Sequence, residues 1–239
     1  IKIKSLIKSK TKIICFDSLT RQNLNTIYTT TKKHFPQGLL VGSGGLTKSL
    51  SESIESLSYK PKKIDLKRKS FALISLSSHP TTKTHFTKLA EHKQILRVSI
   101  DTDALLFSHS FDKEYTRIAC IIENAILLQQ NIAINQSNHP SLNKPNEIFL
   151  SKQLHIFLSK ISAKLISYGY YKTLILIGGD TAHTVLQTAS IKEIDVAGEI
   201  LPGTVVSLPL MKNTKLKLIT KSGGFGDEQH ISNLISKLL

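Results

Sequence analysis

Three short segments rich in glycine and serine each follow an apolar stretch of the sequence. They are residues 75–78 at the end of "FALIS", 178–181 after "TLILI" and 222–226 after "KLITK". Glycine lets backbone N–H groups approach a polyanion, and the N-terminus of a following helix adds partial positive charge. None of the three is a P-loop or a dinucleotide-binding fingerprint. One such turn alone would indicate only a tight strand-to-helix connection, but three together favour a phosphate-binding site.

The elements that must position these turns alternate along the chain from residue 71 onward. Short apolar runs predict strands at 71–78, 95–101, 131–135 and 171–177. Periodic apolar positions predict helices at 80–92, 111–130 and 151–168. The polar segment 136–147, with two prolines, predicts a loop. This alternation is typical of a doubly wound α/β domain, with a mostly parallel sheet and helices on both faces, which binds ligands beyond the carboxyl ends of its strands.

The first 60 residues show a shorter alternation. Strand-like "KIICFD" and "GLLVGSGG" each precede a helical pattern, which predicts a β-α-β-α unit of α/β type. The segment "YKPKKIDLKRKS" then brings six basic residues together and favours a solvated linker. We therefore expect a first domain at 1–60, a basic linker at 61–70 and a second domain at 71–239.

Composition limits the function classes. The 239-residue chain has a formal net charge of +15, but only four of its 32 basic residues are arginine. Lysines spread along the chain disfavour nucleic-acid binding. Such binding would require the basic cluster at 59–70 to form one face of the protein. There is no apolar run of about 18 residues to span a membrane. Cys15 and Cys120 lie in apolar runs, which predicts buried, reduced thiols and a cytoplasmic location.

The ordered motifs "LILIGGDTAHTVLQ", "GEILPG" and "LKLITKSGGFG" resemble the nucleotide-binding C-terminal domain of the four-carbon acid sugar kinase family. The resemblance covers about residues 71–239. It includes the entry motif "ISLSSHPTT", in which Leu76 stands where the family usually has glycine. Members of this family phosphorylate threonate, erythronate or 3-oxo-tetronate with ATP. The resemblance thus implies a carbohydrate kinase with ATP and Mg²⁺ as cofactors.

The resemblance also implies roles for individual residues. Contacts to ATP are expected from Ser77, Gly178, Gly179, Asp180, Thr181, Ser222, Gly223 and Gly224. Asp180 is the candidate catalytic side chain and Mg²⁺ ligand, because hard cations favour carboxylate and phosphate oxygens; capping the next helix is its alternative role. Glu199 either touches the ribose or shapes a structural turn. Lys221 either meets a phosphate or is one more solvated lysine.

Residues 1–60 resemble the end of the family's N-terminal substrate domain. Asp17, Ser43 and Gly44 are accordingly expected to line a cleft for the acid sugar. The family's Asp-Asp-x-Thr-Gly-Ala motif is not found in these 239 residues, so we expect an upstream segment of the substrate domain to be missing, as in a fragment or a split gene. A catalytically silent nucleotide-binding remnant or regulatory protein stays open. No membrane partner is expected, and a homodimer stays open.

Overall fold

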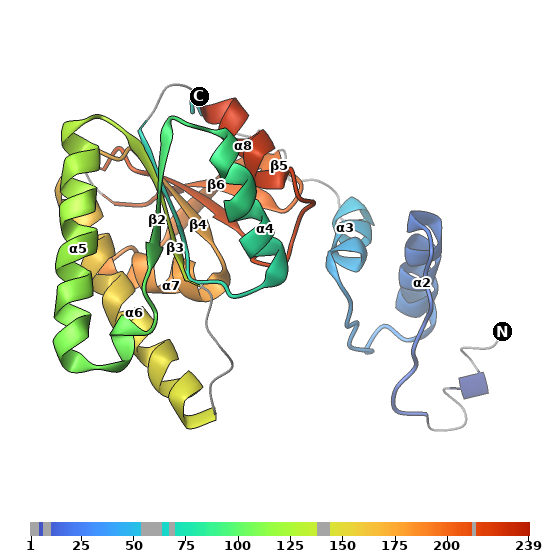
Figure 1. Ribbon diagram of the computed structural model, residues 1–239. Coiled ribbons are helices and arrows are strands. Elements are labelled where there is room, and N and C mark those ends of the chain that lie inside the picture. The colour runs from blue at the N-terminus through green and yellow to red at the C-terminus, as the bar shows by residue number, and fades with distance from the viewer. Residues whose placement is uncertain (1–4, 7–10, 54–63, 67–69, 138–143, 212–213) are drawn as a thin grey trace. The chain divides into compact units, whose positions relative to one another are not determined.

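The computed structural model describes residues 5–6, 11–53, 64–66, 70–137, 144–211 and 214–239. The chain forms two compact units, Ile1–Lys60 and Pro61–Leu239. The larger unit contains a seven-stranded sheet in the order β2-β3-β1-β4-β7-β6-β5 (Figure 1). Its strands are β1 (Phe71–Ser75), β2 (Ile95–Ile100), β3 (Asn131–Gln136), β4 (Thr173–Ile177), β5 (Ile194–Leu201), β6 (Thr204–Pro209) and β7 (Lys217–Lys221).

The centre of the sheet is parallel. β2, β3, β1, β4 and β7 pair in parallel, whereas β6 pairs antiparallel with both β7 and β5. Every residue of β1 and of β4 is buried, because helices cover both faces of a parallel sheet. The predicted doubly wound, mostly parallel α/β fold is thus confirmed.

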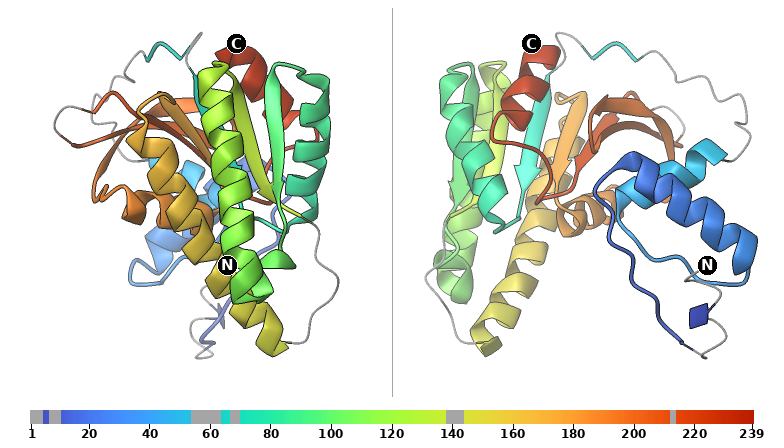
Figure 2. Two further views of the ribbon diagram at one scale, coloured as in Figure 1. Left: turned by 60° about the vertical axis from the view of Figure 1, so that its left-hand side comes forward. Right: turned by 90° about the vertical axis from the view of Figure 1, so that its right-hand side faces the viewer.

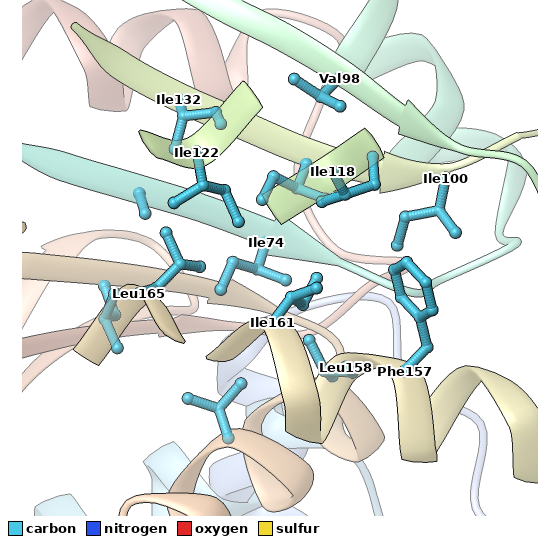
Figure 3. Packing of buried hydrophobic residues seen from close by; sticks show 14 of the residues in the cluster. Ile74, Val98, Ile100, Ile118, Ile122, Ile132, Phe157, Leu158, Ile161 and Leu165 are labelled. Atoms are coloured by element: carbon cyan, nitrogen blue, oxygen red, sulfur yellow. The ribbon is translucent and has the colours of Figure 1, made fainter. Parts of the chain in front are cut away.

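Helices lie on both faces of the sheet (Figures 1 and 2). They are α4 (Pro80–Lys88), α5 (Ser108–Leu127), α6 (Lys144–Ser167), α7 (Gly179–Thr188) and α8 (His230–Leu238), with short 3₁₀ turns at Leu89–Glu91 and Ala104–Leu106. Side chains alternate along a strand, so Ile74 packs in the core with α5, α6 and α7 (Figure 3). Its neighbour Leu73 belongs to the opposite core, beneath α4 and α8.

One helix boundary and one hairpin differ most from the sequence-based expectation. Helix α6 begins at Lys144 and not at residue 151, because Pro145 falls in the first helical turn, where proline breaks no hydrogen bond. Strands β5 and β6 form a hairpin that the sequence pattern did not predict. Neither difference changes the order of the central elements of the second unit.

The first unit contains two described helices, α2 (Arg21–His34) and α3 (Gly44–Ser53). Thr20 and Asn23 form a capping box at the start of α2, and Arg21 pairs with Glu52 on α3. The expected strands "KIICFD" and "GLLVGSGG" have no strand assignment. An extended segment becomes a strand only by pairing with a neighbour, and no such neighbour exists among the described residues of this unit. The β-α-β-α expectation is therefore wrong for its two strands.

Two further expectations concern exposure. Cys15 and Cys120 are free but exposed, so the prediction of buried thiols is wrong. On α5, Ile118 and Ile122 face the core, and steps of about 100° per residue place Cys120 on the outer side between them. Within the described ranges, no helix is both long and apolar enough to cross a membrane. Most of the basic linker at 61–70 lies outside the described residues.

Candidate functional site

The three glycine and serine turns meet at the carboxyl edge of the parallel strands. The turns after β1, β4 and β7 border one cavity of about 790 Å³. Seven of the eight residues that the resemblance assigns to ATP line it, namely Ser77, Gly178, Gly179, Asp180, Thr181, Gly223 and Gly224. Ser222 is not among the lining residues. The chain leaves β1 for α4 on one face and β4 for α7 on the other, which opens a crevice between neighbouring strands.

Hydrogen bonds join the turns to one another. The Leu76 N–H donates to Thr181 Oγ1 at 3.0 Å and connects the first turn to the second. The Gly178 N–H donates to the Lys221 carbonyl at 2.9 Å. Thr82 Oγ1, in the first turn of α4, donates to the Gly223 carbonyl at 2.9 Å. The cavity wall is therefore a cross-linked backbone structure and not three independent loops.

Glycine is required at two of these positions for different reasons. Gly178 has φ +101°, a conformation that side chains disfavour. A Cβ on Gly223 would lie 2.7 Å from Ser77 Oγ, so the first and third turns approach too closely for a side chain. At Gly179, in contrast, a Cβ would meet nothing within 4 Å and would extend into open space at the cavity wall.

The cavity is lined by backbone donors. Six N–H groups along this edge donate to no group that the structure describes, namely those of Ser78, Gly179, Asp180, Thr181, Gly223 and Gly224. Those of α7 are free because the first turn of a helix has no intrahelical acceptor. Free N–H groups at a helix N-terminus attract anions, and the helix dipole adds to this attraction. The edge can therefore bind a polyanion through its backbone.

Asp180 is the second residue of α7, and the N-cap position belongs to Gly178. The alternative role of Asp180 as a helix cap is therefore wrong. Its side chain is exposed and lines the cavity. The described residues contain no group of three or more side chains that could by themselves hold a metal ion. Mg²⁺ needs no such group, because it is commonly held by one or two carboxylates together with phosphate oxygens and water.

The opposite wall of the cavity was not predicted from the sequence. It consists of the first three turns of α6 and the end of β3, with Gln136, Glu147, Leu150, Ser151, Leu154 and His155. Gln136 Nε2 donates to the Leu76 carbonyl at 2.8 Å, and His155 Nδ1 lies 2.7 Å from Thr184 Oγ1. The sequence pattern did not predict this wall, because it assigned residues 136–147 to a loop. In the structure α6 starts at Lys144, which adds two helical turns that reach the cavity.

The structure shows one of the two predicted roles of Glu199 and excludes one of the two predicted for Lys221. The Glu199 carboxylate accepts a hydrogen bond from the Gly203 N–H at 2.7 Å, so it shapes the turn between β5 and β6. Lys221 is only 3% exposed and is not a solvated lysine. Burial lowers the pKa of its ammonium group to about 8. It does not line the cavity, but it lies directly before the third turn.

The predicted acid-sugar residues lie in the first unit, beside the starts of its two helices. Asp17 is exposed in the segment before α2, Ser43 immediately precedes α3, and Gly44 is the first residue of α3. The Ser43 carbonyl accepts hydrogen bonds from the N–H groups of Leu46 and Thr47. A role for these residues in binding an acid sugar stays a prediction.

The sequence model of the nucleotide-binding C-terminal domain family matches residues 72–231, which include all three turns. The chain belongs to this family. The expected relation to the nucleotide-binding domain of four-carbon acid sugar kinases is thus confirmed. A search of curated proteins returned no significant match.

Solved structures share the fold at low sequence identity. A protein of Salmonella typhimurium LT2, provisionally named a tRNA synthase, is similar with a TM-score of 0.66 at 21% identity, over 98% of this chain and 54% of its own. Haemophilus influenzae protein HI1011 is similar with a TM-score of 0.57 at 17% identity, over 93% of this chain and 53% of its own. A protein of Bordetella bronchiseptica, solved as a citrate-bound, domain-swapped dimer, is similar with a TM-score of 0.56 at 15% identity, over 99% of this chain and 56% of its own. The chain thus spans little more than half the length of each.

Proposed function

We propose that the second unit binds ATP with Mg²⁺ in the cavity at the carboxyl edge of β1, β4 and β7. The observation that carries this proposal is that three turns bring six residues to one cavity whose N–H groups have no acceptor among the described residues. Family membership supports a nucleotide as the ligand. We further propose that the chain supplies the nucleotide-binding part of a kinase that phosphorylates a four-carbon acid sugar, namely threonate, erythronate or 3-oxo-tetronate.

Phosphoryl transfer requires positioning and neutralisation of charge more than covalent catalysis. Backbone N–H groups of the second and third turns would hold the phosphate oxygens, and the N-terminus of α7 would add partial positive charge. Asp180 would hold Mg²⁺ together with these oxygens. The metal, when bound, supplies further neutralisation of the transferring group. The acid sugar would be bound by the first unit, with Asp17, Ser43 and Gly44 as its candidate contacts.

The nucleotide part of this proposal is tested on the chain as it stands. Calorimetric titration with ATP and Mg²⁺ is expected to show micromolar binding. Turnover is tested after joining the chain to the upstream half of a similar protein, by following ADP release with each of the three acids. No binding of ATP by the parent chain would refute the nucleotide proposal.

A silent nucleotide-binding protein is the second candidate, and Leu76 favours it. Leu76 stands where the family usually has glycine. Its N–H donates a hydrogen bond to Thr181 Oγ1, so it is not available to a nucleotide. Leu76 is not among the described non-glycine residues with positive φ, so leucine fits the backbone at this turn. Binding of ATP without ADP release in the joined protein would establish this second candidate.

Two further properties belong to the same proposal. A homodimer is supported by the domain-swapped dimer of the Bordetella bronchiseptica protein, and light scattering would then give twice the chain mass of 26.5 kDa. A cytoplasmic location is supported by the proposed use of ATP, and fluorescence microscopy of the tagged protein tests it.

A further inference from the structure

A buried lysine lies directly before the third turn. Lys221 ends β7, on the face of the sheet that α4 and α8 cover, and its side chain is almost fully enclosed. No carboxylate in the described part of the chain lies within ion-pair distance of it. An enclosed cation without a carboxylate is costly, because burial removes the water that stabilises its charge. Such a group calls for a role beyond stabilising the fold.

The ammonium group of Lys221 contacts the backbone of the third turn. Its Nζ donates to the Ser222 carbonyl at 2.8 Å and lies 3.5 Å from the Gly223 carbonyl. Thr82 Oγ1 donates to the same Gly223 carbonyl at 2.9 Å. The carbonyl oxygens of Ser222 and Gly223 are therefore bound by protein donors, whereas the N–H groups of Gly223 and Gly224, two residues that line the cavity, have no acceptor among the described residues.

The direction of these peptide groups matters for an anion. A carbonyl oxygen facing a phosphate would repel it, and an N–H group facing it would donate a hydrogen bond. A glycine-rich turn can adopt either arrangement, because glycine has little intrinsic backbone preference. Donors that bind the carbonyls select the arrangement in which the N–H groups remain free.

We propose that Lys221 is a positioning residue for the phosphate site, whose charged ammonium, together with Thr82, holds the third turn with its N–H groups free for the ligand. The inference rests on the proposed binding of a nucleotide in this cavity. The counter-charge for Lys221 would then be the bound phosphate itself. Because a neutral amine binds carbonyls more weakly than an ammonium group does, nucleotide affinity should depend on the protonation of this lysine.

The other charged groups around Lys221 allow the effect to be isolated. His85 on α4 and His230 on α8 both lie within the electrostatic reach of Lys221, and Asp227, in the loop between β7 and α8, acts on the two histidines. Burial and the charge of Lys221 both lower the pKa values of His85 and His230 below their usual range. Both histidines are then neutral above pH 7, so they do not change charge in the range where Lys221 does.

The test is the affinity of the full chain for ATP with Mg²⁺, measured by calorimetry from pH 7 to pH 9. With a lysine pKa of about 8, the charged fraction falls from about 0.9 to about 0.1 over this range, so the dissociation constant should rise about tenfold. Titrations in buffers of different ionisation enthalpy should also show proton uptake on binding near pH 8. A flat profile without proton uptake would overturn the inference even though ATP binds.

Variants separate the positioning role from a purely structural one. Lys221→Met should bind ATP about tenfold more weakly at pH 7 and lose the pH dependence. Lys192→Met, at an exposed lysine away from the cavity, should behave as the parent chain. Thr82→Val keeps the charge, so it should weaken binding but retain the pH dependence. Retention of the pH profile in a folded Lys221→Met protein would overturn the inference. Absence of ATP binding by the parent at every pH would overturn the proposed function and this inference together.

Discussion

Replacement of Gly179 by valine tests the position of the nucleotide without disturbing the fold. Gly179 is the first residue of α7, its N–H is unpaired, and its α-carbon borders the cavity. An added Cβ would meet nothing within 4 Å, so the protein itself has room for the side chain. The two methyl groups of valine would occupy space that a phosphate must enter to reach the N–H groups of the turn.

The expected loss of affinity can be worked from these contacts. Valine would separate the phosphate from at least two N–H groups, and hydrogen bonds to a charged group contribute about 1.5–3 kcal/mol each. Loss of about 3 kcal/mol corresponds to binding weaker by about 100-fold. The free energy of unfolding should change by less than about 0.5 kcal/mol, because valine is not a poorer helix former than glycine.

Calorimetry with ATP and Mg²⁺ measures the affinity, and urea unfolding measures the stability. His183→Val is the matched control, since it introduces the same side chain into α7 at an exposed position outside the cavity lining. The control should bind ATP as the parent chain does. Equal affinities of Gly179→Val and the parent would refute the placement of the phosphates at the second turn.

The remaining predictions concern other features of the second unit. Asp180→Asn should weaken ATP binding about tenfold when Mg²⁺ is present and leave binding in EDTA unchanged; an equal loss in both conditions would argue against a metal-binding role. Gly178→Ala should lower the free energy of unfolding by about 1–3 kcal/mol, since φ is +101° there; a value within about 0.5 kcal/mol of the parent would contradict the strain. The contribution of His85 and His230 to stability in urea should be full above about pH 6.5 and be lost below it, because burial lowers their pKa values and the unfolded chain takes up protons first. Equal stability at pH 7 and pH 5.5 would contradict this last expectation.

The sequence predicts best what depends on local pattern. The buried runs of β1 and β4 are continuous in the sequence, and a serine-rich turn follows the first and a glycine-containing turn the second. Parallel strands end at one edge, so the pattern also predicts that these turns share an edge. Gly223 allows the close approach of two turns that is expected of a glycine-rich site, whereas Gly178 is needed for its positive φ.

What the sequence does not predict depends on partners distant in the chain. The β5–β6 hairpin joins the sheet through pairing with β7, and no local pattern reports that pairing. Apolar residues at 13–16 and 39–41 suggest strands, yet without a neighbouring strand among the described residues of this unit they have no strand assignment. The sequence does not distinguish Lys221 from the many other lysines of the chain. Its burial results from the cover that α4 and α8 provide, which the local sequence does not indicate. Its role could be inferred only from the structure.

The position of β7 has a consequence for synthesis of the protein. β7 lies between β4 and β6, although it follows both in the chain. On the ribosome, β4 and the β5–β6 hairpin are therefore complete before the strand that joins them exists. At about 5–20 residues per second, the facing edges of β4 and β6 remain unpaired for about one to several seconds. Unpaired edges of this kind are sites of aggregation, so the nascent chain is most vulnerable just before the third turn is made.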